Sequence, residues 1–218
     1  MSNQLFLQKL YDLRKEGKYQ EAIDLANSLI CKDPSFAEFY EEVGDSYLSL
    51  KEYGRAEKAL LYAEKLNPNE ANVHYLLGFC YSSTNRFPES IARLETANRL
   101  FPNSPEVLRC LGWSVFFSGK KEEGLKILER AVTMSPSDPL ILADLGVCLL
   151  NDQQFDNAIK TLTFASGIAP EDERIKETLE SARLFKVEYE KLGIHDKRQP
   201  IPWEVFEGPP PEDLATTL

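Results

Sequence analysis

The fold is decided by residues 71–104, ANVHYLLGFCYSSTNRFPESIARLETANRLFPNS, because the main features of this stretch return every 34 residues along the chain. Prolines recur at this interval without a shift, at Pro34, Pro68, Pro102, Pro136 and Pro170. Two further columns keep the same register: Gly44, Gly78, Gly112 and Gly146, and Ala63, Ala97, Ala131 and Ala165. A fixed period of this length is typical of stacked structural repeats.

Within one period the apolar residues have helical spacing and predict two helices. In the second period, Phe39, Val43 and Tyr47 lie on a first helix, and Ala56 and Leu60 lie on a second. The joint at residues 50–53 is short, so the two helices must run antiparallel. The small residues of the glycine and alanine columns let the paired helices approach closely.

Helix ends are also visible in the sequence. Each proline of the column follows a second helix and stops it. Ser35 and Glu38 predict a capping box for the next helix. Ser104-Pro105 and Asp138-Pro139 each place an N-cap residue before a proline at the first helical position.

The pattern Tyr40-x-x-Val43-Gly44-x-x-Tyr47, followed by Ala56-x-x-x-Leu60, Ala63 and Pro68, resembles the tetratricopeptide repeat (TPR). The resemblance implies an all-α, right-handed superhelical solenoid of antiparallel helix pairs. It implies five TPR units, at 3–36, 37–70, 71–104, 105–138 and 139–172. The first unit departs from the pattern, because Lys9 and Leu10 stand where an apolar residue and glycine are expected; a terminal unit with one solvated face explains this.

Residues 173–193 predict a C-terminal capping helix that closes the last repeat. An apolar stripe with helical spacing runs along it, and Gly193 ends it. The stripe consists of Ile175, Leu179, Ala182, Phe185, Tyr189 and Leu192. Residues 194–218 form a proline-rich acidic tail without helical periodicity.

The composition excludes several function classes. The net charge of −10 and the scattered basic residues argue against nucleic-acid binding. No apolar stretch approaches the ~20 residues of a membrane span, and no signal peptide is expected from the N-terminal residues. Cys31, Cys80, Cys110 and Cys148 lack metal-ligand spacing and are interpreted as structural thiols in a reducing compartment, which predicts a cytoplasmic protein.

No catalytic, cofactor or metal-binding motif is recognisable, so an enzyme is not expected. The two histidines, His74 and His195, lie in different modules. His74 occupies a column filled elsewhere by Tyr40, Leu108 and Leu142, which predicts a core position.

In TPR arrays the first helices of successive units line a concave groove. When the groove-facing helix positions of TPR arrays are transferred to this sequence, the resemblance implies a groove that is acidic toward the N-terminus and aromatic in the middle. Trp113, Phe116 and Phe117 are spaced to share one helix face and are candidate apolar anchors; the alternative is that they fill gaps between adjacent first helices. The candidate groove residues are Glu38, Glu41, Glu42, Asp45, Tyr75, Leu76, Phe79, Arg109, Trp113, Phe116, Phe117, Asp144, Val147 and Leu150.

The tail carries candidate anchors of its own at Ile201, Trp203, Val205 and Phe206. Four interpretations stay open for them: docking into the chain's own groove, docking on its outer face, a linear motif for another protein, or a disordered end.

These observations predict a non-enzymatic protein–protein interaction adaptor. Its expected ligand is a protein or peptide segment with apolar anchors and some positive charge. Two alternatives are a small acidic TPR chaperone of the secretion type, although such chaperones typically have three repeats, and a structural subunit that self-assembles as a homo-oligomer.

Overall fold

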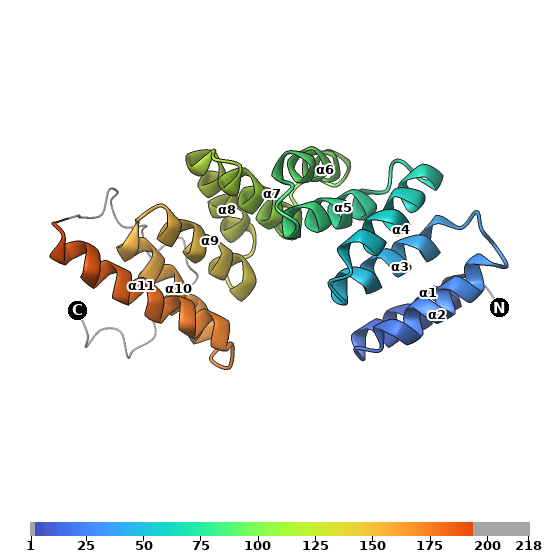
Figure 1. Ribbon diagram of the computed structural model, residues 1–218, viewed down its shortest axis with the longest axis horizontal. Coiled ribbons are helices and arrows are strands. Elements are labelled where there is room, and N and C mark those ends of the chain that lie inside the picture. Colours follow the sequence, from blue (N-terminus) through green and yellow to red (C-terminus); the bar gives the residue numbers. More distant parts are fainter. Residues whose placement is uncertain (1–2, 194–218) are drawn as a thin grey trace. The chain divides into compact units, whose positions relative to one another are not determined.

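The computed structural model describes residues 3–193, and this part of the chain contains eleven helices and no strand (Figure 1). The predicted all-α helical-repeat fold is confirmed. The helices are α1 (Asn3–Lys15), α2 (Tyr19–Ile30), α3 (Ala37–Ser49), α4 (Tyr53–Leu66), α5 (Ala71–Ser83), α6 (Phe87–Leu100), α7 (Pro105–Phe117), α8 (Lys121–Met134), α9 (Pro139–Asn151), α10 (Phe155–Ile168) and α11 (Glu173–Lys191). The predicted tail and its four anchors lie outside the described residues.

The chain divides into two compact units, Met1–Pro102 and Asn103–Leu218. In the first unit, α1 pairs with α2, α3 with α4, and α5 with α6 (Figure 1). The second helices α2 and α4 also pack on the next first helices, α3 and α5, and the first helices α1, α3 and α5 contact one another in sequence order. Leu10 and Phe39 lie in one buried cluster, and Leu60 and Leu77 lie in the next.

In the second unit, α7 pairs with α8 and α9 with α10, and α11 packs against both α10 and α9. The first helices α7 and α9 also touch each other. One continuous buried cluster runs from Leu108 through Leu142 to Ile175. Within each unit the core is therefore assembled from neighbouring helices, as a stacked repeat requires.

Close helix approach depends on the glycine column. A Cβ atom at Gly44 would lie 2.5 Å from Leu60 Cγ, and one at Gly146 would lie 2.5 Å from Leu162 Cγ. In the fourth repeat, a Cβ at Gly112 would lie 2.7 Å from Leu128 Cγ and 3.0 Å from the backbone oxygen of Gly124. The predicted close approach at Gly112 is confirmed.

Of the three predicted N-cap residues, Ser104 and Asp138 are confirmed and Ser35 is wrong. Phe36, not Ser35, is the N-cap of α3 and makes no side-chain cap, while the Ser35 hydroxyl donates to Asp33 Oδ1 at 2.8 Å. The capping box was wrong because Ser35 is used in the preceding turn. Ser104 Oγ accepts from Val107 N at 3.4 Å, and Asp138 Oδ1 accepts from Leu140 N at 2.8 Å, as expected.

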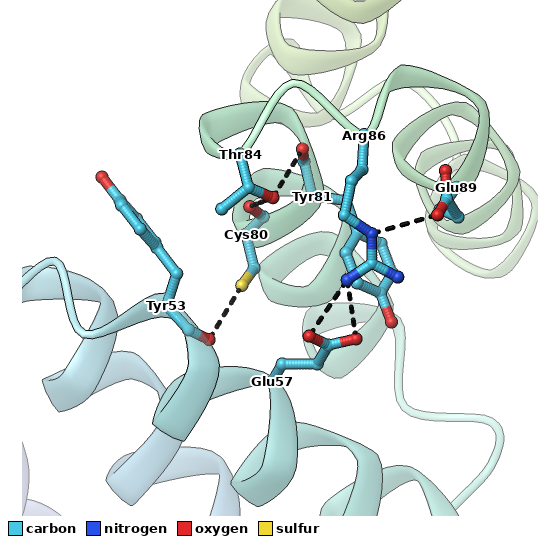
Figure 2. A network of polar contacts seen from close by, with 7 residues as sticks. All are labelled: Tyr53, Glu57, Cys80, Tyr81, Thr84, Arg86 and Glu89. Atoms are coloured by element: carbon cyan, nitrogen blue, oxygen red, sulfur yellow. Dashed lines mark hydrogen bonds and ion pairs between the residues drawn. The ribbon is translucent and has the colours of Figure 1, made fainter.

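Arg86 joins three helices of the first unit, as Figure 2 shows. Its Nη1 donates to both carboxylate oxygens of Glu57 on α4 at 3.0 Å, and its Nε donates to Glu89 on α6 at 3.0 Å. Its guanidinium carbon lies 4.2 Å from the ring centroid of Tyr81 on α5. A planar, multidentate cation of this kind fixes the angle between repeats better than a lysine could.

Cys80 takes part in the same region through its thiol, which donates to the Tyr53 backbone oxygen at 3.4 Å (Figure 2). Burial raises the pKa of Cys80 to about 11. Cys110 and Cys148 are also buried, in agreement with structural thiols, whereas Cys31 is exposed and departs from that interpretation.

The capping stripe of α11 is buried only in its first half. Ile175, Leu179 and Ala182 are buried, but Phe185 is 50% exposed and Leu192 is 73% exposed. The start of α10 still reaches this half of α11, because the ring centroid of Phe155 lies 4.9 Å from that of Tyr189 and Asp156 pairs with Lys186. Phe185 and Leu192 are therefore exposed on a side of the chain that α10 does not cover.

Candidate functional site

Half-buried aromatic side chains lie on the first-helix face of the second unit. Trp113 and Phe117 are four residues apart on α7, and their ring centroids are 4.6 Å apart. Both pack against the unit's core and keep part of their surface exposed. On the neighbouring first helix α9, Val147 and Leu150 are half-buried as well. These four residues are called the apolar face below.

Phe116 does not belong to this face, which corrects the prediction. Its side chain is 2% exposed and lies in the core cluster. Position 116 is turned toward α8, where the Lys121 ammonium lies 5.6 Å from the ring centroid. Leu76 on α5 is likewise buried, at 5% exposure, so it is also excluded as a surface residue.

Arg109 and Asp144 border the apolar face and pair with each other. Arg109 Nη1 lies 2.6 Å from Asp144 Oδ2, which links α7 to α9. Burial raises the pKa of Asp144, and the Arg109 charge opposes that effect. These two predicted groove residues therefore serve a contact between adjacent first helices.

Two carboxylates of the predicted acidic patch of the first unit share one cation of the protein itself. Arg14 on α1 places its Nε 2.9 Å from Glu42 Oε2 and its Nη1 against Asp45. Sequence reasoning missed Arg14. A signal was present, because Arg14 and Asp45 are 31 residues apart, close to one repeat, so they meet on adjacent first helices.

Glu41 has a partner at the same separation. Its Oε1 accepts a hydrogen bond from Asn72 Nδ2 on α5 at 2.6 Å. Burial is the main cause that raises the pKa of Glu41, and Asn72 opposes it. Burial also raises the pKa of Glu42, against the opposing Arg14 charge. Glu38, on the first turn of α3, is exposed.

The remaining predicted residues of the first unit are Tyr75 and Phe79 on α5. Both are half-buried and pack against the cluster that contains Leu77. They give the first unit a smaller aromatic surface on the same helix as Asn72.

His74 occupies a core position, as predicted. Its side chain is buried, and its Nε2 lies 2.9 Å from the Pro68 backbone oxygen. Among residues 3–193 no group of three or more histidine, cysteine, aspartate or glutamate side chains could hold a metal ion. No described helix combines the length and the apolar character that crossing a bilayer demands.

Sequence models of the tetratricopeptide repeat match the chain over most of the helical region. One model matches residues 47–112. A second matches residues 7–71 and 110–172. No curated protein matches the chain in sequence.

Solved structures of TPR proteins share the fold. TTC0263, a TPR protein of the thermophile Thermus thermophilus, has a TM-score of 0.72 and 19% identity, over 84% of this chain and 100% of that chain. YrrB, titled a TPR protein with an unusual peptide-binding site, has a TM-score of 0.61 and 18% identity, over 80% of this chain and 90% of that chain. The Cut9–Hcn1 hetero-tetramer of APC/C has a TM-score of 0.72 and 20% identity, over 87% of this chain and 36% of that chain. On the repeat matches and the observed helix pairs, the chain belongs to the tetratricopeptide repeat family.

Proposed function

We propose that this protein is a non-enzymatic adaptor that binds a segment of a partner protein on the apolar face of its second unit. TPR folds serve protein–protein interaction through the surface that their stacked helices present. The observation that carries the proposal is the partial exposure of Trp113 and Phe117 on α7 and of Val147 and Leu150 on the contacting helix α9. Large apolar side chains that stay partly exposed over a core are typical anchors of an interface.

The size of the face sets the expected affinity. A fully covered aromatic side chain buries ~150–250 Å², and at ~25 cal/mol/Å² the exposed part of two such residues supplies a few kcal/mol. Ordering of the ligand opposes this gain. Binding of a short segment should therefore be of roughly micromolar strength.

The charges indicate what the ligand should carry. Glu42 and Asp45 face Arg14, and Glu41 accepts from Asn72, so a basic ligand would have to displace these contacts. Glu38 is the exposed carboxylate of the predicted patch. The proposed ligand accordingly has apolar anchors as its main feature and positive charge as a minor one.

Two further observations support the proposal. A protein of the same fold, YrrB, is described as having a peptide-binding site, although the likeness extends to the fold alone. Cys31, Cys80 and Cys148 carry free thiols, which fits a reducing compartment; we propose the cytoplasm.

The test compares affinity capture by three variants, with captured proteins identified by mass spectrometry. Trp113→Ala removes the central anchor, and Val147→Ala removes a smaller side chain of the same face. Met134→Ala is the control, because Met134 is a 43% exposed apolar residue on the second helix α8. Circular dichroism checks that each variant keeps its helices.

We expect a partner that is retained by the wild type and by Met134→Ala and is depleted by Trp113→Ala. With the purified partner, calorimetry should show a loss of more than about 1 kcal/mol for Trp113→Ala, and a smaller loss for Val147→Ala. Equal binding by a folded Trp113→Ala variant would contradict the proposal.

A further inference from the structure

A small hollow lies beside the uncovered half of α11. It has a volume of about 260 Å³, below the ~300–1,000 Å³ typical of small-molecule sites. It is therefore sized for a side chain of a polypeptide. The hollow is lined by Leu150, Asn151, Gln153, Phe155, Phe185 and Tyr189.

The lining suits an amphipathic aromatic side chain. Phe155 is 3% exposed, and its ring centroid lies 4.9 Å from that of Tyr189. Phe185, half exposed, adds a third ring. The amide nitrogen of Asn151 donates to Val147 O at 2.8 Å, which leaves its amide oxygen to accept from an incoming N–H group. An apolar floor with a polar rim fits tryptophan, which brings one N–H donor.

We propose that this hollow is the docking site of the chain's own residues 194–218, with Trp203 as the anchoring side chain. The proposal concerns an intramolecular contact, and Leu150 is the one residue of the apolar face that also lines the hollow. It gives the half-exposed Phe185 of α11 a packing partner.

The length of the chain after α11 permits the contact. Trp203 is the tenth residue after Gly193, and ten residue steps span ~33 Å when extended. Phe185 lies eight residues before Gly193, ~12 Å along the helix axis. Gly193 has a φ of +73°, which lets the chain turn away from the axis as it leaves α11.

The same connection favours this segment over an external ligand. A segment tethered this closely competes at roughly millimolar effective concentration. Ile201, Trp203 and Val205 alternate along the sequence, so an extended segment would direct all three to one side. Burying these residues removes both their own apolar surface and that of Phe185 from water.

Tryptophan fluorescence of the full-length chain tests the proposal. Trp113 and Trp203 are the two tryptophans of the sequence, so Trp113→Phe leaves Trp203 as the sole reporter. In that background, Phe185→Ala removes part of the hollow. Val187→Ala is the matched control: Val187 is 48% exposed on the same helix and does not line the hollow.

We expect Trp203 to emit at short wavelength and to resist iodide quenching in the Trp113→Phe protein and in the Val187→Ala control. Phe185→Ala should shift the emission to longer wavelength and raise the quenching constant severalfold. Because Phe185 is half exposed, this variant should fold, and circular dichroism verifies it.

Three results would overturn the inference. Free quenching of Trp203 in the intact chain would show that the segment does not dock. Shielding that survives Phe185→Ala would place the docking elsewhere. Shielding lost on about a hundredfold dilution would assign the hollow to a second copy of the chain. Binding of a partner at Trp113, which does not line the hollow, is tested separately by Trp113→Ala.

Discussion

Gly112 and Gly124 let α7 and α8 touch through their backbones. A Cβ at Gly124 would lie 2.5 Å from the backbone nitrogen of Phe116 and 2.7 Å from the backbone oxygen of Gly112. Backbone atoms cannot rotate away as a leucine side chain can. The positions equivalent to Gly124 in the second and fifth repeats hold alanine, at Ala56 and Ala158. Glycine at 124 therefore lets α7 and α8 approach more closely than an alanine at this position would.

Gly112→Leu and Gly124→Ala should each destabilise the protein by about 1–3 kcal/mol, because the added atoms meet Leu128 or the Phe116 backbone. Gly54→Ala is the control, since nothing lies within 4 Å of a Cβ there, and it should leave stability unchanged or raise it by up to about 1 kcal/mol. Urea unfolding followed by circular dichroism measures each effect. An unchanged midpoint for both variants in the fourth repeat would contradict the close helix approach.

Glu41 makes stability depend on pH. Burial above all, and the nearby charges of Glu70, Glu42 and Glu38, raise its pKa in the folded state, although Asn72 opposes this. A carboxyl group whose pKa is higher when folded binds more protons in the folded state. Its ionisation therefore lowers stability as pH rises from the ordinary glutamate range through the raised pKa.

Glu41→Gln should accordingly stabilise the protein near neutral pH, by up to about 1 kcal/mol, and the gain should vanish in acid, where Glu41 is already protonated. Glutamine keeps an acceptor oxygen for Asn72, so the variant removes the charge and not the hydrogen bond. Unfolding midpoints measured across the acid range provide the check, with Glu95→Gln as the control, because Glu95 is an exposed carboxylate on α6 and is not among the charges that act on Glu41. A gain that persists undiminished in acid would assign the effect to packing.

At the scale of single helices, α9 begins with a strong N-cap and α3 does not. Asp138 Oδ1 accepts from Leu140 N at 2.8 Å and from Ile141 N at 3.3 Å, and Pro139 follows it directly. The corresponding start of α3 at Phe36 has no side-chain cap. Repeats of one period thus use different chemistry at the same position.

Asp138→Ala should cost about 0.5–2 kcal/mol, because it leaves two backbone N–H groups of α9 without their acceptor. Ser35→Ala should change stability by less than about 0.5 kcal/mol, since Ser35 does not cap α3. Urea unfolding of the two variants and the wild type measures both changes in the free energy of unfolding. A larger loss for Ser35→Ala would restore the capping box and contradict the helix start at Ala37.

At the scale of the whole molecule, contacts are local in sequence. Within each unit, helices pack on the next one or two helices of the chain. A mutation that destabilises one repeat should therefore lower the protection of backbone amides against hydrogen exchange mainly within that repeat.

Gly112→Leu should accelerate amide hydrogen exchange in α7 and α8 while α3 and α4, which have their own buried cluster around Leu60, keep their protection. Hydrogen exchange read by mass spectrometry on peptides from both units gives the comparison. Uniform loss of protection across 3–193 would indicate a single cooperative unit.

The helix pattern could be predicted because it is encoded at short range. The 34-residue period, the N1 prolines Pro105 and Pro139, and the glycine column each act within a helix or between a helix and its immediate partner. The site was predicted less completely. Trp113 and Phe117 keep part of their surface exposed, as expected, whereas Phe116, one residue away, is buried against α8.

The sequence by itself therefore determined the family, the helix pairs and the residues of the first-helix faces, because a strict period leaves one way to stack them. Only the tertiary structure decided which of those residues remain exposed and which charges are paired. Arg14 pairs with both Glu42 and Asp45 from a neighbouring helix. Phe185 stays half exposed although α10 reaches Tyr189, four residues further along α11. Burial and pairing of this kind depend on distances between helices, and helical periodicity alone does not contain those distances.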